Sequence, residues 1–91
     1  MRKSKSVKCE ELLLLYDNEL SGSKKNRGLN RLKLRVVRWD DAQPILEKRR
    51  FFYDEDDDVW IPMRNKGLNR GDLELIMQKQ QEIMEVMKNA E

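Results

Sequence analysis

The residues between Leu29 and Trp39 alternate between apolar and charged side chains with a period of two. This period is typical of a strand with one buried face and one exposed face, and no helical spacing collects the apolar residues equally well. The buried face would carry Leu32, Leu34 and Val36, and the exposed face Arg31, Lys33, Arg35, Val37 and Trp39. The pattern therefore predicts a strand whose exposed face is basic and ends in an indole.

Three further strands are predicted on either side of this one. Residues 40–44 have the composition of a turn and the acidic run 54–58 that of a hairpin loop, and Pro62 favours an edge position for the last strand. The third strand places polar side chains on both faces, so the pattern leaves its register open. The additional strands are expected over residues 7–17, 45–53 and 59–63.

Two segments are predicted to lack regular structure. Residues 1–6 are expected to form a disordered basic tail, and residues 18–28, which contain Lys24 and Lys25, to form a mobile basic arm. Everything between the tail and the C-terminus, residues 7–89, is expected to be one domain, because 91 residues are too few for two.

A helix is predicted from Arg70 to about Asn89. Asn69 is placed to cap its N-terminus, and Asp72, three residues on, completes a capping box. Apolar spacings of three and four residues form a seam that is typical of a helix packed on another helix. The seam, and so the predicted dimer interface, consists of Leu73, Ile76, Gln80, Ile83 and Met87. The elements predict an α+β fold, with a four-stranded antiparallel sheet followed by one C-terminal helix. A homodimer through the helices is expected, and a single helix lying on its own sheet is the alternative.

The net charge of +2 hides an uneven distribution along the chain. Residues 24–50 contain ten basic and three acidic residues, a net charge of +7, whereas residues 54–58 carry −5. Basic residues interleaved with Trp39, Phe51 and Phe52 favour a site for single-stranded nucleic acid, because cations follow phosphates and aromatic rings stack on unpaired bases. A solvated, charged sheet face is the alternative interpretation.

The composition argues against an enzyme. The chain has no histidine, which is the commonest general base and metal ligand, and its one cysteine, Cys9, excludes a disulfide framework and a cysteine zinc cluster. The longest uninterrupted apolar run, Leu12 to Tyr16, is far shorter than the ~20 residues of a membrane-spanning helix, and no signal peptide is predicted. We therefore expect a cytoplasmic protein, nucleoid-associated if bacterial, with no catalytic residues, metal or cofactor.

Three short motifs follow one another in a specific order. Trp-Asp-Asp-Ala-Gln-Pro spans residues 39–44, Glu-Lys-Arg-Arg-Phe-Phe-Tyr spans residues 47–53, and Lys-Gly-Leu-Asn spans residues 66–69, directly before the helix. Their order and spacing resemble the positive-cofactor-four family of transcriptional coactivators, and more closely its short bacterial members. The resemblance covers about residues 10–88.

The resemblance implies a curved four-stranded sheet backed by a helix, a homodimer formed through the helices, and non-sequence-specific binding of single-stranded DNA across the open sheet face. By match, Arg49 would contact a phosphate or a base, and Lys66 the nucleic-acid backbone. Trp39 and either Phe51 or Phe52 would stack on bases. With the basic strand face, the arm and Arg64 added, the predicted nucleic-acid-binding residues are Trp39, Arg49, Phe51, Phe52, Lys66, Lys33, Arg35, Lys24, Lys25 and Arg64.

The leading hypothesis is thus a dimeric protein that binds single-stranded DNA without sequence specificity and acts in transcription, replication or repair. The choice between DNA and RNA stays open. A protein-interaction module that binds an acidic partner through its basic sheet face is the first alternative, and a helix-mediated structural or antitoxin-like dimer without nucleic acid is the second. No membrane association is expected.

Overall fold

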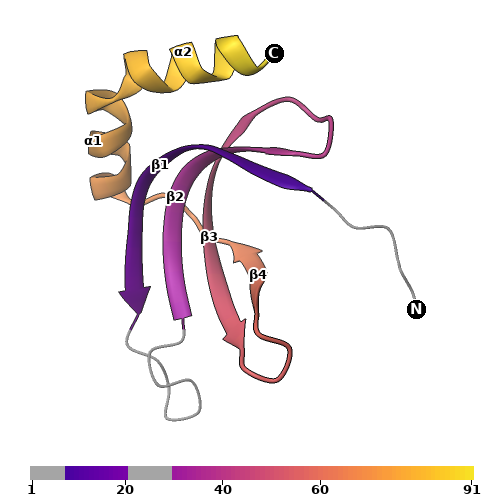
Figure 1. Cartoon of the computed structure of the whole chain (residues 1–91). Coiled ribbons are helices and arrows are strands. Elements are labelled where there is room, and N and C mark those ends of the chain that lie inside the picture. The colour runs from indigo at the N-terminus through magenta and orange to yellow at the C-terminus, as the bar shows by residue number, and fades with distance from the viewer. Residues whose placement is uncertain (1–7, 21–29) are drawn as a thin grey trace.

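Four strands connected in chain order form one antiparallel sheet, and two helices follow it (Figure 1). The computed structural model describes residues 8–20 and 30–91, so the expected tail and the arm lysines Lys24 and Lys25 lie outside the described residues. The predicted α+β class and antiparallel sheet are confirmed. The elements are β1 Cys9–Leu20, β2 Asn30–Trp39, β3 Ile45–Asp54, β4 Val59–Asn65, α1 Arg70–Gln78 and α2 Gln80–Ala90.

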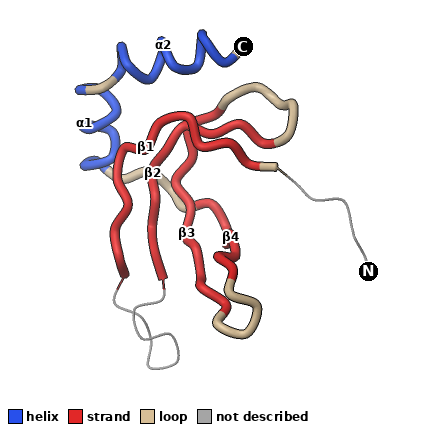
Figure 2. The backbone as a smooth tube through the Cα atoms, viewed as in Figure 1, coloured by secondary structure: helices blue, strands red, loops and turns tan. Residues whose placement is uncertain are grey.

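The sheet is strongly curved, with both helices on its convex side and its concave side open (Figure 2). β1 skips one residue in its pairing with β2 between Glu11 and Leu13, and a second between Leu14 and Tyr16. Such bulges bend a strand and increase its twist. A third irregularity lies in the pairing of β3 with β4, after Arg49. These interruptions account for a sheet that folds around a concave face.

The apolar core lies along β2 and beneath α2. Leu34 and Val36, on the predicted buried face of β2, have no exposed surface. α2 packs across β1 and β2 and buries Ile83, which is 5% exposed. Arg38 Nη1 donates a hydrogen bond of 2.7 Å to the Ala90 carbonyl, where the last carbonyls of α2 have no partner within the helix. The C-terminal helix is therefore held on the sheet by both apolar burial and a polar contact at its end.

A buried polar cluster attaches the start of α1 to the sheet. The predicted capping box is confirmed, with Asn69 and Asp72 each accepting a hydrogen bond from the other's backbone N–H. Asp72 also accepts hydrogen bonds from Lys48 Nζ (2.7 Å) and the Tyr16 hydroxyl (2.8 Å). Lys48 is thus paired beneath the helix rather than solvated.

The prediction of one continuous C-terminal helix is wrong, because the helix breaks at Lys79. Lys79 has φ −108° and ψ 18°, outside the helical region, and its N–H is shared between the carbonyls of Leu75 and Ile76. The break turns α2 across the top of the sheet (Figure 1). Burying a side chain such as Ile83 is worth about 1.5–3 kcal/mol, which offsets the interrupted helix. The five predicted seam residues therefore lie on two helices of different direction.

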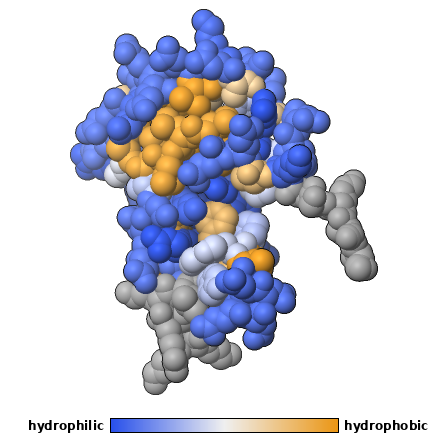
Figure 3. Space-filling view, viewed as in Figure 1, coloured by the Kyte–Doolittle hydropathy of each residue, from blue (hydrophilic) through white to orange (hydrophobic). Residues whose placement is uncertain are grey.

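The helices also leave apolar side chains exposed. Figure 3 shows apolar surface gathered in the upper part of the molecule, beside the two helices. Leu73 and Met77 of α1 and Met84 of α2 are 49%, 67% and 66% exposed. Within the described residues, neither helix is long and apolar enough to cross a membrane.

Candidate nucleic-acid interface

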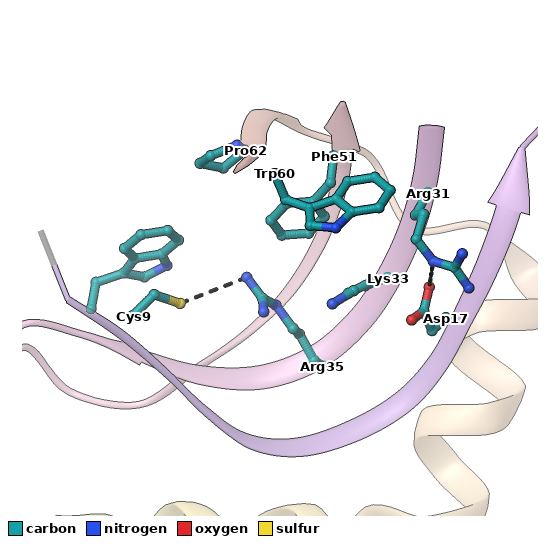
Figure 4. Close-up of a pocket in the computed structure, with 9 residues that line it drawn as sticks. Cys9, Asp17, Arg31, Lys33, Arg35, Phe51, Trp60 and Pro62 are labelled. Carbon is teal, nitrogen blue, oxygen red and sulfur yellow. Dashed lines mark hydrogen bonds and ion pairs between the residues drawn. The ribbon is translucent and has the colours of Figure 1, made fainter. Parts of the chain in front are cut away.

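All four strands contribute side chains to a hollow of about 580 Å³ on the concave face of the sheet, called here the concave hollow (Figure 4). Four of the five residues on the face of β2 that was predicted to be exposed line this hollow, but Val37 does not, and both Val37 and Arg35 are buried. The lining residues are Cys9 and Asp17 from β1, Arg31, Lys33, Arg35 and Trp39 from β2, Phe51 from β3, and Trp60 and Pro62 from β4.

A buried carboxylate, that of Glu47 in β3, organises one end of the concave hollow. Glu47 Oε1 accepts hydrogen bonds from Trp39 Nε1 (3.1 Å) and Arg49 Nη2 (3.0 Å). Glu47 Oε2 accepts one from Arg35 Nη2 (3.3 Å). Glu47 lies directly opposite Arg35 in the pairing of β2 with β3, and directly opposed residues share a face. One carboxylate thereby fixes an indole and two guanidinium groups.

The protonation of Glu47 follows from these contacts. Burial alone would raise the pKa of its carboxyl, but hydrogen bonds from Arg49, Trp39 and Arg35 outweigh that effect and hold the pKa below its usual value. Glu47 is therefore ionised at neutral pH. Burial raises the pKa of the nearby Cys9 thiol, so Cys9 is protonated at neutral pH and poorly suited to act as a nucleophile.

Phe51 lies on the concave face but beneath the cations. Its side chain is buried, the Arg35 guanidinium is 4.7 Å from the ring centroid, and Lys33 Nζ is 5.2 Å from it. A base would have to displace these cations to stack on the ring. Phe52, the next residue along the strand, points to the opposite face by alternation. Of the two phenylalanines, only Phe51 is at the concave hollow.

Trp60 is the aromatic residue of the concave hollow that the sequence analysis missed. The residue is 44% exposed, its ring contacts the Tyr53 ring at 5.1 Å between centroids, and Figure 4 shows its indole reaching over the hollow beside Phe51. The face of Trp60 depends on its pairing opposite Tyr53, which the sequence does not give. The available signal was the alternation of Trp60 with Pro62 in the short predicted strand.

The cations of the concave hollow are paired with acids from β1. Arg31 Nε is 2.7 Å from Asp17 Oδ1, and Arg35 Nη1 is 3.1 Å from Glu11 Oε1. Lys33 Nζ is 4.0 Å from the same Glu11 oxygen. The basic face expected from β2 alone is therefore largely neutralised by its neighbour in the sheet.

The other predicted residues fall at the edges of the concave hollow or away from it. Arg49 Nη1 donates to the Met63 carbonyl at 2.6 Å, and its guanidinium lies 5.2 Å from the Trp39 ring centroid. Arg64 and Lys66 are exposed, at the end of β4 and just beyond it, and neither lines the hollow. The structure thus brings together Trp39, Lys33, Arg35, Arg49 and Phe51, but not Phe52, Arg64 or Lys66.

Comparisons of the chain with protein-family models, with curated proteins and with solved structures found no match. Function is therefore inferred from the residues of the concave hollow.

Proposed function

We propose that the concave hollow binds single-stranded DNA without sequence specificity. The half-exposed indole of Trp60, held over a curved sheet beside Arg31 and Lys33, is the observation that carries this proposal. An exposed aromatic ring is a stacking platform for any unpaired base, and neighbouring cations attract the backbone. The protein would then hold unpaired strands during transcription, replication or repair.

Membership of the positive-cofactor-four family, as a short bacterial-type member, is part of the proposal. A curved four-stranded antiparallel sheet with helical structure on its convex side is what the resemblance implies. The break at Lys79 departs from the single helix of that pattern. Relation to the family therefore stays part of the proposal.

The alternative function, binding of an acidic protein partner, is favoured by one observation. Arg31 and Arg35 already hold carboxylates, those of Asp17 and Glu11, in hydrogen-bonding geometry. A partner's aspartate or glutamate side chains would offer the same group. The two functions differ in whether Trp60 stacks on a base.

Fluorescence anisotropy with labelled oligo-dT, a duplex of equal length and a polyglutamate peptide separates these functions. Single-strand binding predicts affinities in the order oligo-dT, duplex, peptide, because only unpaired bases present a free ring face. Preference for the peptide would instead favour the alternative, and binding of none of the three would contradict both.

The chain's single cysteine locates the bound strand. Cys9 lines the concave hollow, so saturating oligo-dT should slow its alkylation by a maleimide, followed at alkaline pH because the pKa of the thiol is raised. Duplex of equal length at the same concentration serves as the control. Binding of oligo-dT with unchanged alkylation would place the strand elsewhere on the molecule.

A homodimer formed through the helices is part of the same proposal. The exposed apolar side chains of Leu73, Met77 and Met84 support it, because a chain of this length gains stability by covering such surface. Leu73→Asp combined with Met77→Asp should shift the sedimentation coefficient from dimer to monomer. Ile83 is unsuited to this test because it is buried within its own chain. A wild-type protein that sediments as a monomer at micromolar concentration would contradict the dimer.

A further inference from the structure

The acids of β1 occupy the positions that a phosphate would need. Asp17 accepts the Nε hydrogen of Arg31 at 2.7 Å, and Glu11 accepts from Arg35 Nη1 at 3.1 Å. Carboxylate and phosphate oxygens compete for the same guanidinium donors. Arg35 is also held by Glu47 and its side chain is only 8% exposed, so it is the cation least available to a phosphate.

The charge of the concave face is therefore small. Its four cations, Arg31, Lys33, Arg35 and Arg49, stand against four carboxylates, those of Glu11, Asp17, Glu47 and Glu19, the last of which lies directly opposite Arg31 in the pairing of β1 with β2, so these charges cancel. Each phosphate neutralised on a single strand contributes about 0.7 to the slope of log affinity against log salt. With its cations already paired to carboxylates, this face is expected to make at most about one such contribution.

The exposed part of the Trp60 indole, unlike the cations of the concave hollow, is not already occupied by a neighbouring side chain that a ligand would have to displace. Trp60 is 44% exposed and its ring contacts Tyr53, so part of the indole is available to a ligand. Base stacking on such a ring is worth about 1–3 kcal/mol by alanine substitution. On this face, stacking outweighs the attraction of cations that are already paired with carboxylates.

We infer that the concave hollow recognises unpaired bases and draws at most about one phosphate contact from its own cations, because Glu11 and Asp17 compete with the nucleic-acid backbone for Arg31, Lys33 and Arg35. This inference rests on the proposed function. It specifies a ligand with accessible bases rather than any flexible polyanion.

The test compares labelled oligo-dT with an abasic oligonucleotide of equal length, which has the same phosphates and no bases. Wild-type protein should bind oligo-dT at least about tenfold more tightly, within the range of one to a few stacked bases. The double variant Glu11→Gln with Asp17→Asn removes two negative charges from the concave face and leaves their cationic partners free to bind phosphate. Its affinity for the abasic strand should therefore rise. Its salt slope should steepen by about 1.4, which is about a sevenfold greater loss of affinity between 50 and 200 mM salt.

The matched control is Glu82→Gln with Glu85→Gln on α2, which changes the net charge equally on the convex side of the sheet. This control should leave the slope close to that of the wild type. Because all slopes are compared with the same wild-type chain, contributions from residues outside the concave hollow cancel. Far-UV circular dichroism and thermal melting of each variant verify that it is folded.

Two results would overturn the inference while leaving the proposed function intact. One is equal affinity of the wild type for oligo-dT and the abasic strand, which would mean that phosphates dominate. The other is a folded Glu11→Gln, Asp17→Asn variant with the wild-type slope and abasic affinity. Failure of every variant to bind oligo-dT would instead remove the proposed function and the inference together.

Discussion

The two faces of the curved sheet each hold one buried carboxylate that accepts three hydrogen bonds. On the concave face, the donors to Glu47 are Arg35, Trp39 and Arg49. On the convex face, the donors to Asp72 are Tyr16, Lys48 and the Asn69 backbone. In both cases burial opposes ionisation and the hydrogen bonds outweigh it, so that the pKa of each carboxyl lies below its usual value.

The two clusters differ in what they connect. All partners of Glu47 lie on β2 and β3, which are already joined by backbone hydrogen bonds. Asp72 joins α1 to β1 and β3 and bridges 56 residues of sequence to reach Tyr16. Equal local chemistry therefore serves two purposes, since Glu47 sets the geometry of the concave hollow and Asp72 sets the position of the helices.

The largest expected effect is on stability, at the convex cluster. Asp72→Ala removes the partner of buried Lys48 and the half of the capping box in which the Asp72 side chain accepts from the Asn69 N–H, and breaking a buried ion pair costs about 3–5 kcal/mol. Urea denaturation followed by far-UV circular dichroism measures the loss. Asp72→Asn, which retains a side-chain acceptor, should lie between this variant and the wild type. A variant within about 0.5 kcal/mol of the wild type would show that Asp72 does not anchor α1.

The next largest expected effect is on nucleic-acid binding at the concave face, where two tryptophan variants distinguish a loss of affinity from a loss of stability. Trp60→Ala should weaken oligo-dT binding about five- to a hundredfold, the worth of one stacked base, with little change in melting temperature. Trp39→Ala should lower both, because its indole N–H is bonded to Glu47 and the Arg49 guanidinium lies over its ring. Anisotropy and thermal melts on the same samples test the contrast. Wild-type affinity in a folded Trp60→Ala protein would contradict the assignment of this ring to stacking.

The pH dependence of stability should differ between the clusters at high pH only. Burial and the hydrogen bond to Asp72 raise the pKa of Tyr16 to about 12. The neutral phenol is thus favoured in the folded state, and its stabilisation is complete below pH 10 and lost as the pH rises towards 12. Tyr16→Phe should lower stability by about 1.5 kcal/mol at neutral pH and remove this alkaline loss. Identical alkaline curves for the two proteins would contradict the hydrogen bond.

At low pH the Glu47 cluster and the Asp72 cluster should both lose stabilising free energy. Because the pKa values of Glu47 and Asp72 are lowered by folding, their stabilisation is present above the usual carboxyl values and is lost as the pH falls below them. Acid titration should show a smaller loss of stability in Tyr16→Phe than in the wild type, because the Tyr16 hydroxyl is one of the donors that lower the pKa of Asp72.

The smallest expected effect is at the acidic hairpin between β3 and β4. Neutralising Asp56, Asp57 and Asp58 to Asn should strengthen oligonucleotide binding at low salt by about 0.2–1 kcal/mol, the range for exposed charges. The gain should disappear near 1 M salt, where the Debye length is about 3 Å. Unchanged affinity at low salt would mean that the bound strand lies away from this end of the sheet.

Local patterns predicted the elements that are decided locally. Alternation along β2 identified the faces of Leu34 and Lys33, and the spacing of Asn69 and Asp72 identified the start of α1. These features depend on residues within a few positions of one another. They could therefore be predicted from the sequence before the tertiary fold was known.

Features that depend on distant partners were not predictable in this way. No glycine or proline marks the break at Lys79, which follows from the burial of Ile83 against the sheet. The charge of the concave face was overestimated because Glu11 and Asp17 neutralise it from a strand that the linear charge count treated separately. Trp60 was missed for the same reason, since its face is set by pairing with β3.

The two skipped residues in β1 have a consequence for changes in chain length. Each skip reverses which face the following side chains take, so the second skip cancels the first, and Glu11 and Asp17 both reach the concave face while Tyr16 reaches Asp72. Deleting one of the skipped residues, Leu12 or Leu15, would remove one skip and leave the other residues paired as before, so Tyr16 and Asp17 would keep their faces. Deleting both would keep the same faces and straighten the strand. Loss of a skipped residue is therefore expected to reduce the curvature of the sheet without changing its register.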